Sequence, residues 1–337
     1  MTDRSARLAP RRAIAALAGL ALAAGAGAQM LSDPALAPLY EAERTAELER
    51  GARERLAARP DDAQAVLALA LAAMERTDDT LRRDALERAR GCAKRQPQAQ
   101  PCHYAHGMLL GVQAMSEGMF AAARSAGTVR EALTTAHGLD PAWYPGRSAL
   151  LEFHAMAPGF MGGSTARAAE LAATAPRPDQ VAALQARLLL GERKLAEALP
   201  RLLALLPVAD PALRGDVLQW GTQAGLGLVN DGKAAQAQAW FERLAREHPE
   251  ESAGPYGLAR VRGELGDWAA VPALLERTGR LRGASQWPID YRLGIAQQQL
   301  GQREAARASL QRFVDAGRGH KASLEDARKR LTELGGR

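Results

Sequence analysis

The sequence predicts an all-α protein, built as a solenoid in which antiparallel helical hairpins stack one after another. Between Val217 and Gly317 one pattern returns three times: a helix with a small residue near its centre runs into a glycine turn, and a second helix follows. The turn glycines are Gly232, Gly266 and Gly301, and the small residues seven positions earlier are Gly225, Ala259 and Gly294. Their spacing of 34 and 35 residues suits two helices of about 12–14 residues with their two turns.

Composition supports the same fold class. Aromatic residues make up 4% of the 337-residue chain, so alanine and leucine carry most of its apolar fraction. Alanine-rich helices pack closely, which suits a solenoid in which each repeat touches its neighbours. The sequence has no sustained alternation of apolar and polar residues, which is the pattern that predicts strands.

The clearest repeat ends at Pro249. Its first helix carries an apolar face with steps of four, three and four residues, formed by Val217, Gly221, Ala224 and Leu228. Its second helix carries the facing stripe, formed by Ala237, Trp240, Phe241, Leu244 and Ala245. Gly232 can end the first helix in the left-handed conformation, and Pro249 cannot continue the second.

These repeats resemble the tetratricopeptide repeat (TPR) family, in which a small residue of the first helix faces a small residue of the second. Here Gly225 faces Ala237, and Gly294 faces Ala306. The middle repeat departs from the pattern, because Val271 stands where alanine is expected. The resemblance implies a right-handed α-solenoid whose first helices line a concave groove that accepts peptides or other proteins.

Carrying the groove positions of the family onto this sequence selects a set of polar and aromatic residues. The candidate partner-binding residues are Tyr104, Gln219, Asn230, Tyr256, Arg260, Tyr291 and Gln298. Tyrosine recurs at equivalent places, and its ring offers a large contact area with a polar tip. The alternative is that these tyrosines pack between repeats.

Residues 1–28 are typical of a cleaved secretory signal peptide. Four arginines precede the short apolar stretch Ala13–Ala24, and Ala26-Gly27-Ala28 forms a small-x-small cleavage site before Gln29. The apolar stretch is too short for a membrane-spanning helix, which needs roughly 20 residues. The sequence therefore predicts a periplasmic or secreted bacterial protein with no stable membrane insertion after cleavage.

The net charge of +6 gives little information about partners. The chain has 44 basic and 38 acidic residues, and the first 28 residues hold four arginines and one aspartate. The remainder thus holds 40 basic and 37 acidic residues, interspersed along the predicted helices. Interspersed charges are typical of solvated helix faces, so no nucleic-acid partner is expected.

We expect two helical regions after the signal peptide, 29–178 and 179–337, with Pro176-Arg177-Pro178 as the boundary. The first should begin with a long helix from Asp33 to about Ala58 and include an extended hairpin whose second helix is Phe120–Leu139. The second region should contain the TPR repeats and end in a capping helix, Leu324–Leu334, that is apolar on one side and charged on the other.

A glycine-rich loop, residues 157–164, joins two helices of the first region. Similar connections occur in secreted bacterial TPR proteins, and we expect Phe160 and Met161 to pack over the adjacent hairpin. Ser164 is expected to cap the following helix. An anion bound by free N–H groups at that helix start is the alternative.

Cys92 and Cys102 are the two cysteines of the chain, and the prolines between them require a turn from one helix to the next. In an exported protein this arrangement predicts a disulfide. His103 and His106 could share one helix face with Cys102, but zinc requires three or four ligands, so we expect no metal.

The sequence contains no recognisable catalytic motif. We therefore expect a non-enzymatic scaffold or adaptor of the cell envelope, without a cofactor, that binds another envelope protein or an extended peptide along the concave groove. The alternative is a small-molecule-binding accessory protein of a transporter or envelope enzyme.

Overall fold

The computed structural model describes residues 30–76 and 78–335. The predicted signal peptide, residues 1–28, lies outside this part of the chain. The first helices are α1 (Ala37–Glu41), α2 (Thr45–Ala58), α3 (Ala63–Glu75), α4 (Asp79–Arg95), α5 (Gln100–Glu117), α6 (Met119–Leu139), α7 (Tyr144–Met156) and α8 (Thr165–Ala173). They are followed by α9 (Pro178–Gly191), α10 (Leu195–Ala204), α11 (Pro211–Asn230), α12 (Ala234–Glu247), α13 (Ala253–Glu264), α14 (Val271–Gly279), α15 (Ile289–Gln299), α16 (Arg303–Ala316) and α17 (Lys321–Gly335).

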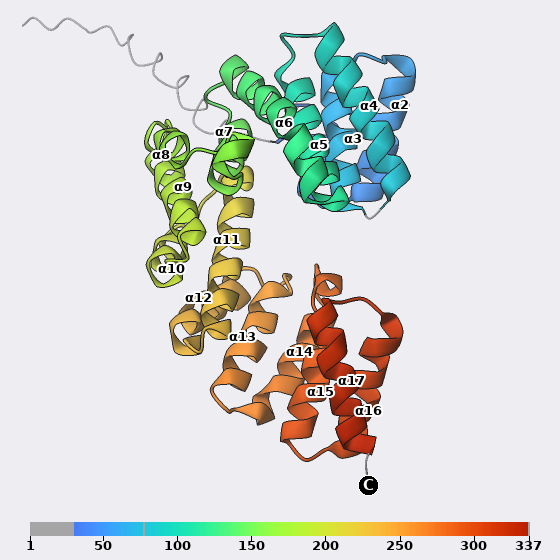
Figure 1. Ribbon diagram of the computed structural model, residues 1–337, viewed down its shortest axis with the longest axis vertical. Coiled ribbons are helices and arrows are strands. Elements are labelled where there is room, and N and C mark those ends of the chain that lie inside the picture. Colours follow the sequence, from blue (N-terminus) through green and yellow to red (C-terminus); the bar gives the residue numbers. More distant parts are fainter. Residues whose placement is uncertain (1–29, 77, 336–337) are drawn as a thin grey trace, which may run out of the picture.

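The predicted fold class is confirmed: the described chain is an all-α, TPR-like solenoid. Each helix packs on the next one in the sequence, and first helices such as α11 and α13 also contact each other. In Figure 1 the helices α2–α6 lie on the same side of the molecule as α14–α17, and α8–α12 join these two arms on the opposite side. The solenoid therefore bends so that segments far apart in the sequence face one another.

Aspartate side chains fix where several helices begin. The carboxylate of Asp62 accepts a hydrogen bond from the Ala65 amide at the start of α3 (3.1 Å), and Asp210 accepts one from the Ala212 amide at the start of α11 (3.1 Å). These bonds satisfy N–H groups that have no partner inside the helix. The predicted turn glycines Gly232, Gly266 and Gly301 all have positive φ, at 72°, 82° and 72°.

The packing of α11, α12 and α13 is built on aromatic rings that lie directly against glycines. A Cβ added to Gly225 of α11 would lie 2.8 Å from the Phe241 ring, and one added to Gly257 of α13 would lie 2.0 Å from it. Likewise, a Cβ on Gly221 would lie 2.1 Å from Trp240. Phe241 and Trp240 of α12 are fully buried. The expected crossing of Gly294 is also present, because its Cβ would meet Leu310 at 2.6 Å.

The prediction of one long helix from Asp33 to Ala58 is wrong. The chain forms the short helix α1 and then α2, separated by a turn at residues 42–44. Glu43 has a positive φ of 53°, and the Arg44 amide donates to the Leu39 carbonyl (2.9 Å). A residue in the left-handed conformation ends a helix, so the chain changes direction here and α1 does not continue into α2.

The glycine-rich loop folds differently from the expectation for Phe160, whose side chain is 82% exposed. The loop makes its own turn, in which the Ser164 amide donates to the His154 carbonyl (2.9 Å). Gly163 is required there, because a Cβ would lie 1.7 Å from the Ala157 carbonyl oxygen. The expected cap is present, since Ser164 Oγ accepts from the Arg167 amide (3.3 Å). This backbone turn leaves Phe160 facing solvent.

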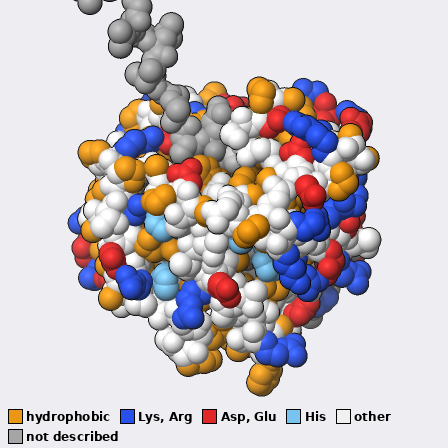
Figure 2. All heavy atoms as spheres, turned by 90° about the horizontal axis from the view of Figure 1, so that it is seen from above, with side chains coloured by type: hydrophobic (Ala, Val, Ile, Leu, Met, Phe, Trp, Pro, Cys, Tyr) orange, Lys and Arg blue, Asp and Glu red, His pale blue; other side chains and the backbone are white. Residues whose placement is uncertain are grey.

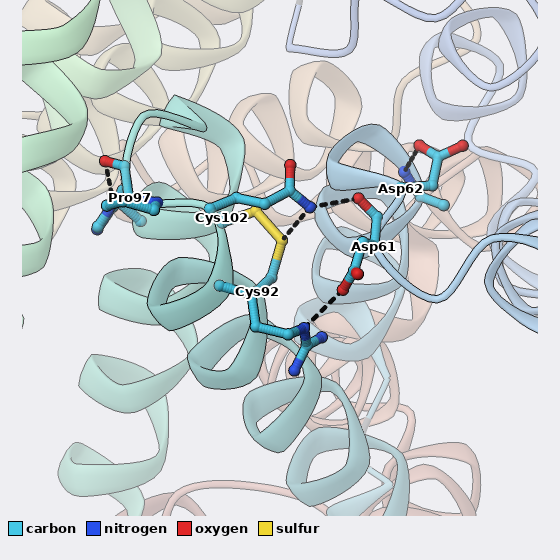
Figure 3. The surroundings of a disulfide bond; sticks show 9 residues. Asp61, Asp62, Cys92, Pro97 and Cys102 are labelled. Carbon is cyan, nitrogen blue, oxygen red and sulfur yellow. Dashed lines mark hydrogen bonds and ion pairs between the residues drawn. A yellow bond between two sulfur atoms is a disulfide. The ribbon is translucent and has the colours of Figure 1, made fainter.

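The predicted disulfide between Cys92 and Cys102 is present (Figure 3). It joins the end of α4 to the start of α5, with 5.5 Å between the two Cα atoms, and both residues are fully buried. Nearby, Arg95 Nε donates to Asp61 Oδ1 (2.6 Å), which ties α4 to the turn between α2 and α3 (Figure 3). The turn between α4 and α5 is thereby fixed covalently.

The C-terminal helix α17 packs as the predicted capping helix. Ala327 is fully buried in a cluster with Tyr291, Leu310 and Phe313, and Leu331 packs against this cluster. Basic and acidic side chains are interspersed over the face of the molecule seen from above in Figure 2. Among the described residues, no helix combines the length and apolar character that would let it cross a membrane.

We predict that Gly257→Ala lowers the free energy of unfolding, because the added methyl group overlaps the Phe241 ring. Overpacking of this kind costs about 1–3 kcal/mol. The measurement is the urea midpoint of unfolding followed by circular dichroism.

The matched control is Gly127→Ala in α6, where a Cβ would have no neighbour within 4 Å. Replacing an unhindered helix glycine by alanine stabilises by about 0.5–1 kcal/mol. Equal midpoints for the two variants would contradict the role of the Gly257–Phe241 contact.

Candidate partner-binding site on the inner face

A pocket of about 520 Å³ lies where three distant parts of the chain meet. Residues 30–43 and Glu75 form one wall, and residues 211–219 of α11 form the second. The turn after α12, together with Arg282 from the α14–α15 loop, forms the third. The bend of the solenoid creates this pocket, because it brings residues 30–43 and Glu75 of the first helices against residues 211–282.

Carboxylates dominate the lining of this pocket, which we call the acidic pocket. Its acidic residues are Glu41, Glu43, Glu75, Asp216, Glu250 and Glu251. Its basic or titratable nitrogen groups come from Arg214, Arg282 and His248. A concave surface with this charge balance attracts cations, because low-dielectric walls concentrate the field of the carboxylates. The arrangement can therefore hold a positively charged group.

Arg282 connects the two arms at the rim of the acidic pocket. Its Nε lies 3.3 Å from Glu43 Oε2 of the α1–α2 turn, and its Nη2 lies 3.6 Å from Glu250 Oε1 and also contacts Glu251. Backbone hydrogen bonds fix the loop, because the Arg282 amide donates to the Glu250 carbonyl and the Ser252 amide to the Arg282 carbonyl, both at 3.0 Å. Exposed ion pairs contribute at most about 1 kcal/mol, so Arg282 matters here for the charge it places at the rim.

The carboxyl group of Glu43 shows the electrostatic character of this rim. Burial raises its pKa above the ordinary value, and the neighbouring carboxylates Glu251, Glu75 and Glu250 raise it further, while Arg282 opposes them. A cation entering the pocket would act in the same direction as Arg282 and favour the ionised form.

Asp216 forms the floor of the acidic pocket and is held by two side chains of α7. Its Oδ2 accepts hydrogen bonds from Tyr144 Oη (2.7 Å) and Ser148 Oγ (2.6 Å), which lie one helical turn apart. Burial raises the pKa of Asp216 to about 6, although both hydrogen bonds oppose the shift, and the charge of Glu152 adds to it. The Tyr40 phenol at the opposite wall has its pKa raised to about 12, chiefly by burial.

The three predicted tyrosines lie inside the helical stack. Tyr104 makes an edge contact with Trp143, with ring centroids 4.8 Å apart, and Tyr256 stacks on Trp287 at 4.4 Å. Tyr291 packs on Phe313 at 5.2 Å. All three are buried: the ring contacts of Tyr104 and Tyr256 join one repeat to the next, whereas that of Tyr291 lies within its own hairpin.

The other predicted residues are divided between different places on the solenoid. Arg260 Nη2 donates to Asn230 Oδ1 (2.7 Å), which brings these two together between α11 and α13. Gln298 accepts a hydrogen bond from Arg330 of α17 (2.8 Å). Of the seven predicted residues, Gln219 alone lines the acidic pocket.

The sequence did not predict most acidic residues of the pocket, because they lie in turns or at helix ends, where acidic side chains are ordinarily solvated. Glu43, Glu250 and Glu251 have no sequence spacing that relates them. Asp216 is the exception, since it is a carboxylate just before the apolar face that begins at Val217. The position of Asp216 beside this apolar face is the one signal in the sequence that could have identified it as part of the acidic pocket.

The structure places no further metal-ligating side chains with His103 and His106 among the described residues, as a zinc site would require. Cys102 is consumed in the disulfide. In the part of the chain that the structure describes, no three His, Cys, Asp or Glu side chains form a group that could hold a metal ion.

No protein-family model matches this chain, and no curated protein matches it. Among solved structures it is similar to a chain of the structure described as "Structure of Naa15/Naa10 bound to HypK-THB". The TM-score is 0.26 and the sequence identity is 15%, over 89% of this chain and 50% of that one. The chain thus spans half the length of this neighbour, and a similarity at this level carries no argument about the site.

We predict that Asp216→Asn stabilises the protein above about pH 6. The folded-state pKa of about 6 exceeds the ordinary value of 3.8, so the ionised carboxylate lowers the stability of the folded state. This loss of stability is complete above the folded-state pKa. It disappears as the pH falls below 3.8, the ordinary pKa that Asp216 has in the unfolded chain. The difference in urea midpoint between variant and parent should therefore shrink as the pH is lowered through 6.

The exposed Asp315→Asn variant controls for the loss of one negative charge. A lower midpoint for Asp216→Asn than for the parent at every pH would contradict the expectation. It would mean that the hydrogen bonds from Tyr144 and Ser148 favour the carboxylate more than burial disfavours it.

Proposed function

We propose that this chain is a non-enzymatic scaffold that binds an extended segment of another protein on its inner face. In this proposal the acidic pocket receives a lysine or arginine side chain of that segment. The observation that supports it is the concentration of six carboxylates around a pocket of about 520 Å³. A pocket of this size falls within the range that encloses an organic ligand.

The shape of the solenoid favours an extended partner. Stacked repeats present a continuous concave surface, and repeat proteins use such surfaces for binding. Gln219 of α11 lines the acidic pocket, and the Arg260–Asn230 pair joins α13 to α11 farther along the inner helices. We infer that the basic side chain fixes where the partner segment lies along the groove. The partner residues on either side of it would contact the polar side chains of the inner helices.

The proposed basic group also suits the electrostatics of the rim. Arg282 already bridges Glu43, Glu250 and Glu251. Glu41 and Glu75 lie on the same wall as Glu43 but have no arginine partner among the described residues, and Glu75 accepts a hydrogen bond from the Thr45 hydroxyl. A second cation would be attracted to this wall and repelled by Arg282. This asymmetry favours a position beside Glu41 and Glu75 for the incoming side chain in this proposal.

We further propose that the protein acts outside the cytosol, in the bacterial cell envelope. Two features support this: the signal-like composition of residues 1–28 and the buried disulfide, because disulfides persist in oxidising compartments.

We predict that basic peptides bind the acidic pocket in preference to acidic ones. Labelled extended peptides of random sequence, with a fixed central Arg, Lys, Gln or Glu, would be titrated and followed by fluorescence anisotropy. The Arg and Lys pools should bind about tenfold or more tightly than the Glu pool, equivalent to about 1.4 kcal/mol. Their affinity should fall as salt is added.

The test variant is Glu41→Lys with Glu75→Lys, which should remove the preference for basic peptides. The matched control is Glu54→Lys with Glu304→Lys, because these exposed glutamates lie outside the pocket and the charge change is the same. Equal affinity for all four pools, or an equal loss in both double variants, would contradict the proposal.

We also predict that the protein isolated from its native envelope begins at Gln29 and contains no free thiol. Intact-mass measurement and N-terminal sequencing would check the cleavage, and thiol labelling in denaturant without reductant would check Cys92 and Cys102. Labelling after reduction is the positive control. An intact Met1 terminus together with two reactive thiols would contradict the envelope proposal.

A further inference from the structure

A second pocket, of about 470 Å³, lies between α4, α5 and α6 and shares no lining residue with the acidic pocket. We call it the basic pocket. Its basic or titratable nitrogen groups come from Arg90, Lys94, His103, His106 and Arg124. Three hydroxyl groups also line it, from Ser125, Thr128 and Thr135. In Figure 2, which looks down on the end of the molecule where α5 and α6 lie, histidine side chains are visible beside lysine and arginine side chains.

The positive charge of the basic pocket is only partly neutralised by its surroundings. Glu131 is the one carboxylate among its lining residues, and Arg90 pairs with Glu87 outside the pocket. Lys94 and Arg124 form no ion pair with any part of the chain that the structure describes. Burial lowers the pKa of His106, and the charges of Arg90, His103 and Lys94 lower it further.

The disulfide ties together two of the three helices that form the pocket, α4 and α5. Cys92 is two residues before Lys94, and Cys102 immediately precedes His103. The bond between them therefore ties the part of α4 that carries Lys94 to the part of α5 that carries His103. A site whose cations are held in place before binding loses less entropy when the ligand arrives.

We propose that the basic pocket binds a phosphate group. Phosphate carries close to two negative charges and three strong acceptor oxygens. Lys94 and Arg124 would supply permanent cations, and the Ser125 and Thr128 hydroxyls would supply further donors. The Thr135 hydroxyl already donates to the Glu131 carbonyl (2.9 Å). A ligand that carries one carboxylate group instead of a phosphate would leave most of these donors unpaired. Leu86 and Leu110 add an apolar part to the lining, which could contact the organic portion of a phosphate ester.

The test uses the oxidised chain at low ionic strength. Inorganic phosphate is titrated while the ring signals of the six histidines are followed by NMR, with His103 and His106 assigned from single His→Gln variants. We expect the signals of His103 and His106 to move, and the other four to stay in place. Calorimetry with inorganic phosphate and with adenosine monophosphate then gives the two affinities.

The variant Lys94→Glu with Arg124→Glu should weaken phosphate binding by about tenfold or more. Arg201→Glu with Lys233→Glu is the matched control, because it makes the same charge change at exposed residues outside the pocket. Circular dichroism checks that each double variant is folded.

Tighter binding of adenosine monophosphate than of inorganic phosphate would support a phosphate ester as the ligand. Equal or weaker binding would support free phosphate. The proposal is overturned if the His103 and His106 signals do not respond to millimolar phosphate, or if both double variants lose affinity equally. Neither result bears on peptide binding in the acidic pocket.

Discussion

The contact on which the solenoid depends is an aromatic ring held between two glycines. Phe241 of α12 lies against Gly225 of α11 on one side and Gly257 of α13 on the other. Because neither glycine has a side chain, three consecutive helices approach one ring at once. Trp240 repeats the contact at Gly221. Interiors are packed so closely that even one added methyl group lowers stability, and these contacts therefore set how far each hairpin lies from the next.

The distance and angle between successive hairpins decide the bend of the whole stack, and the bend decides which surfaces meet. Carboxylates from the α1–α2 turn, from α11 and from the turn after α12 surround one pocket because of this bend. Most of them are exposed and contribute little to stability. Their importance lies in the field they create together. Asp216 is half-buried, and hydrogen bonds from Tyr144 and Ser148 fix its carboxylate, which adds to that field.

The two pockets carry opposite charge and lie on different helices. The acidic pocket is formed by distant segments, so it depends on the bend of the solenoid. The basic pocket is formed by three consecutive helices and a disulfide, so it depends on local packing alone. A single chain thus carries an acidic and a basic pocket, because the two are lined by different residues of the solenoid.

The sequence by itself determined the helical class, the turns at Gly232, Gly266 and Gly301, the crossings at Gly225 and Gly294, and the Cys92–Cys102 pairing. All of these depend on residues near one another in the chain, where helix periodicity and turn chemistry act directly. It did not determine the break at Glu43, whose left-handed backbone has no signal in the residue type, or the burial of the predicted groove tyrosines. The acidic pocket was decided only by the tertiary structure. Glu43 and Arg282 meet across most of the chain, and their proximity follows from the summed geometry of every hairpin between them.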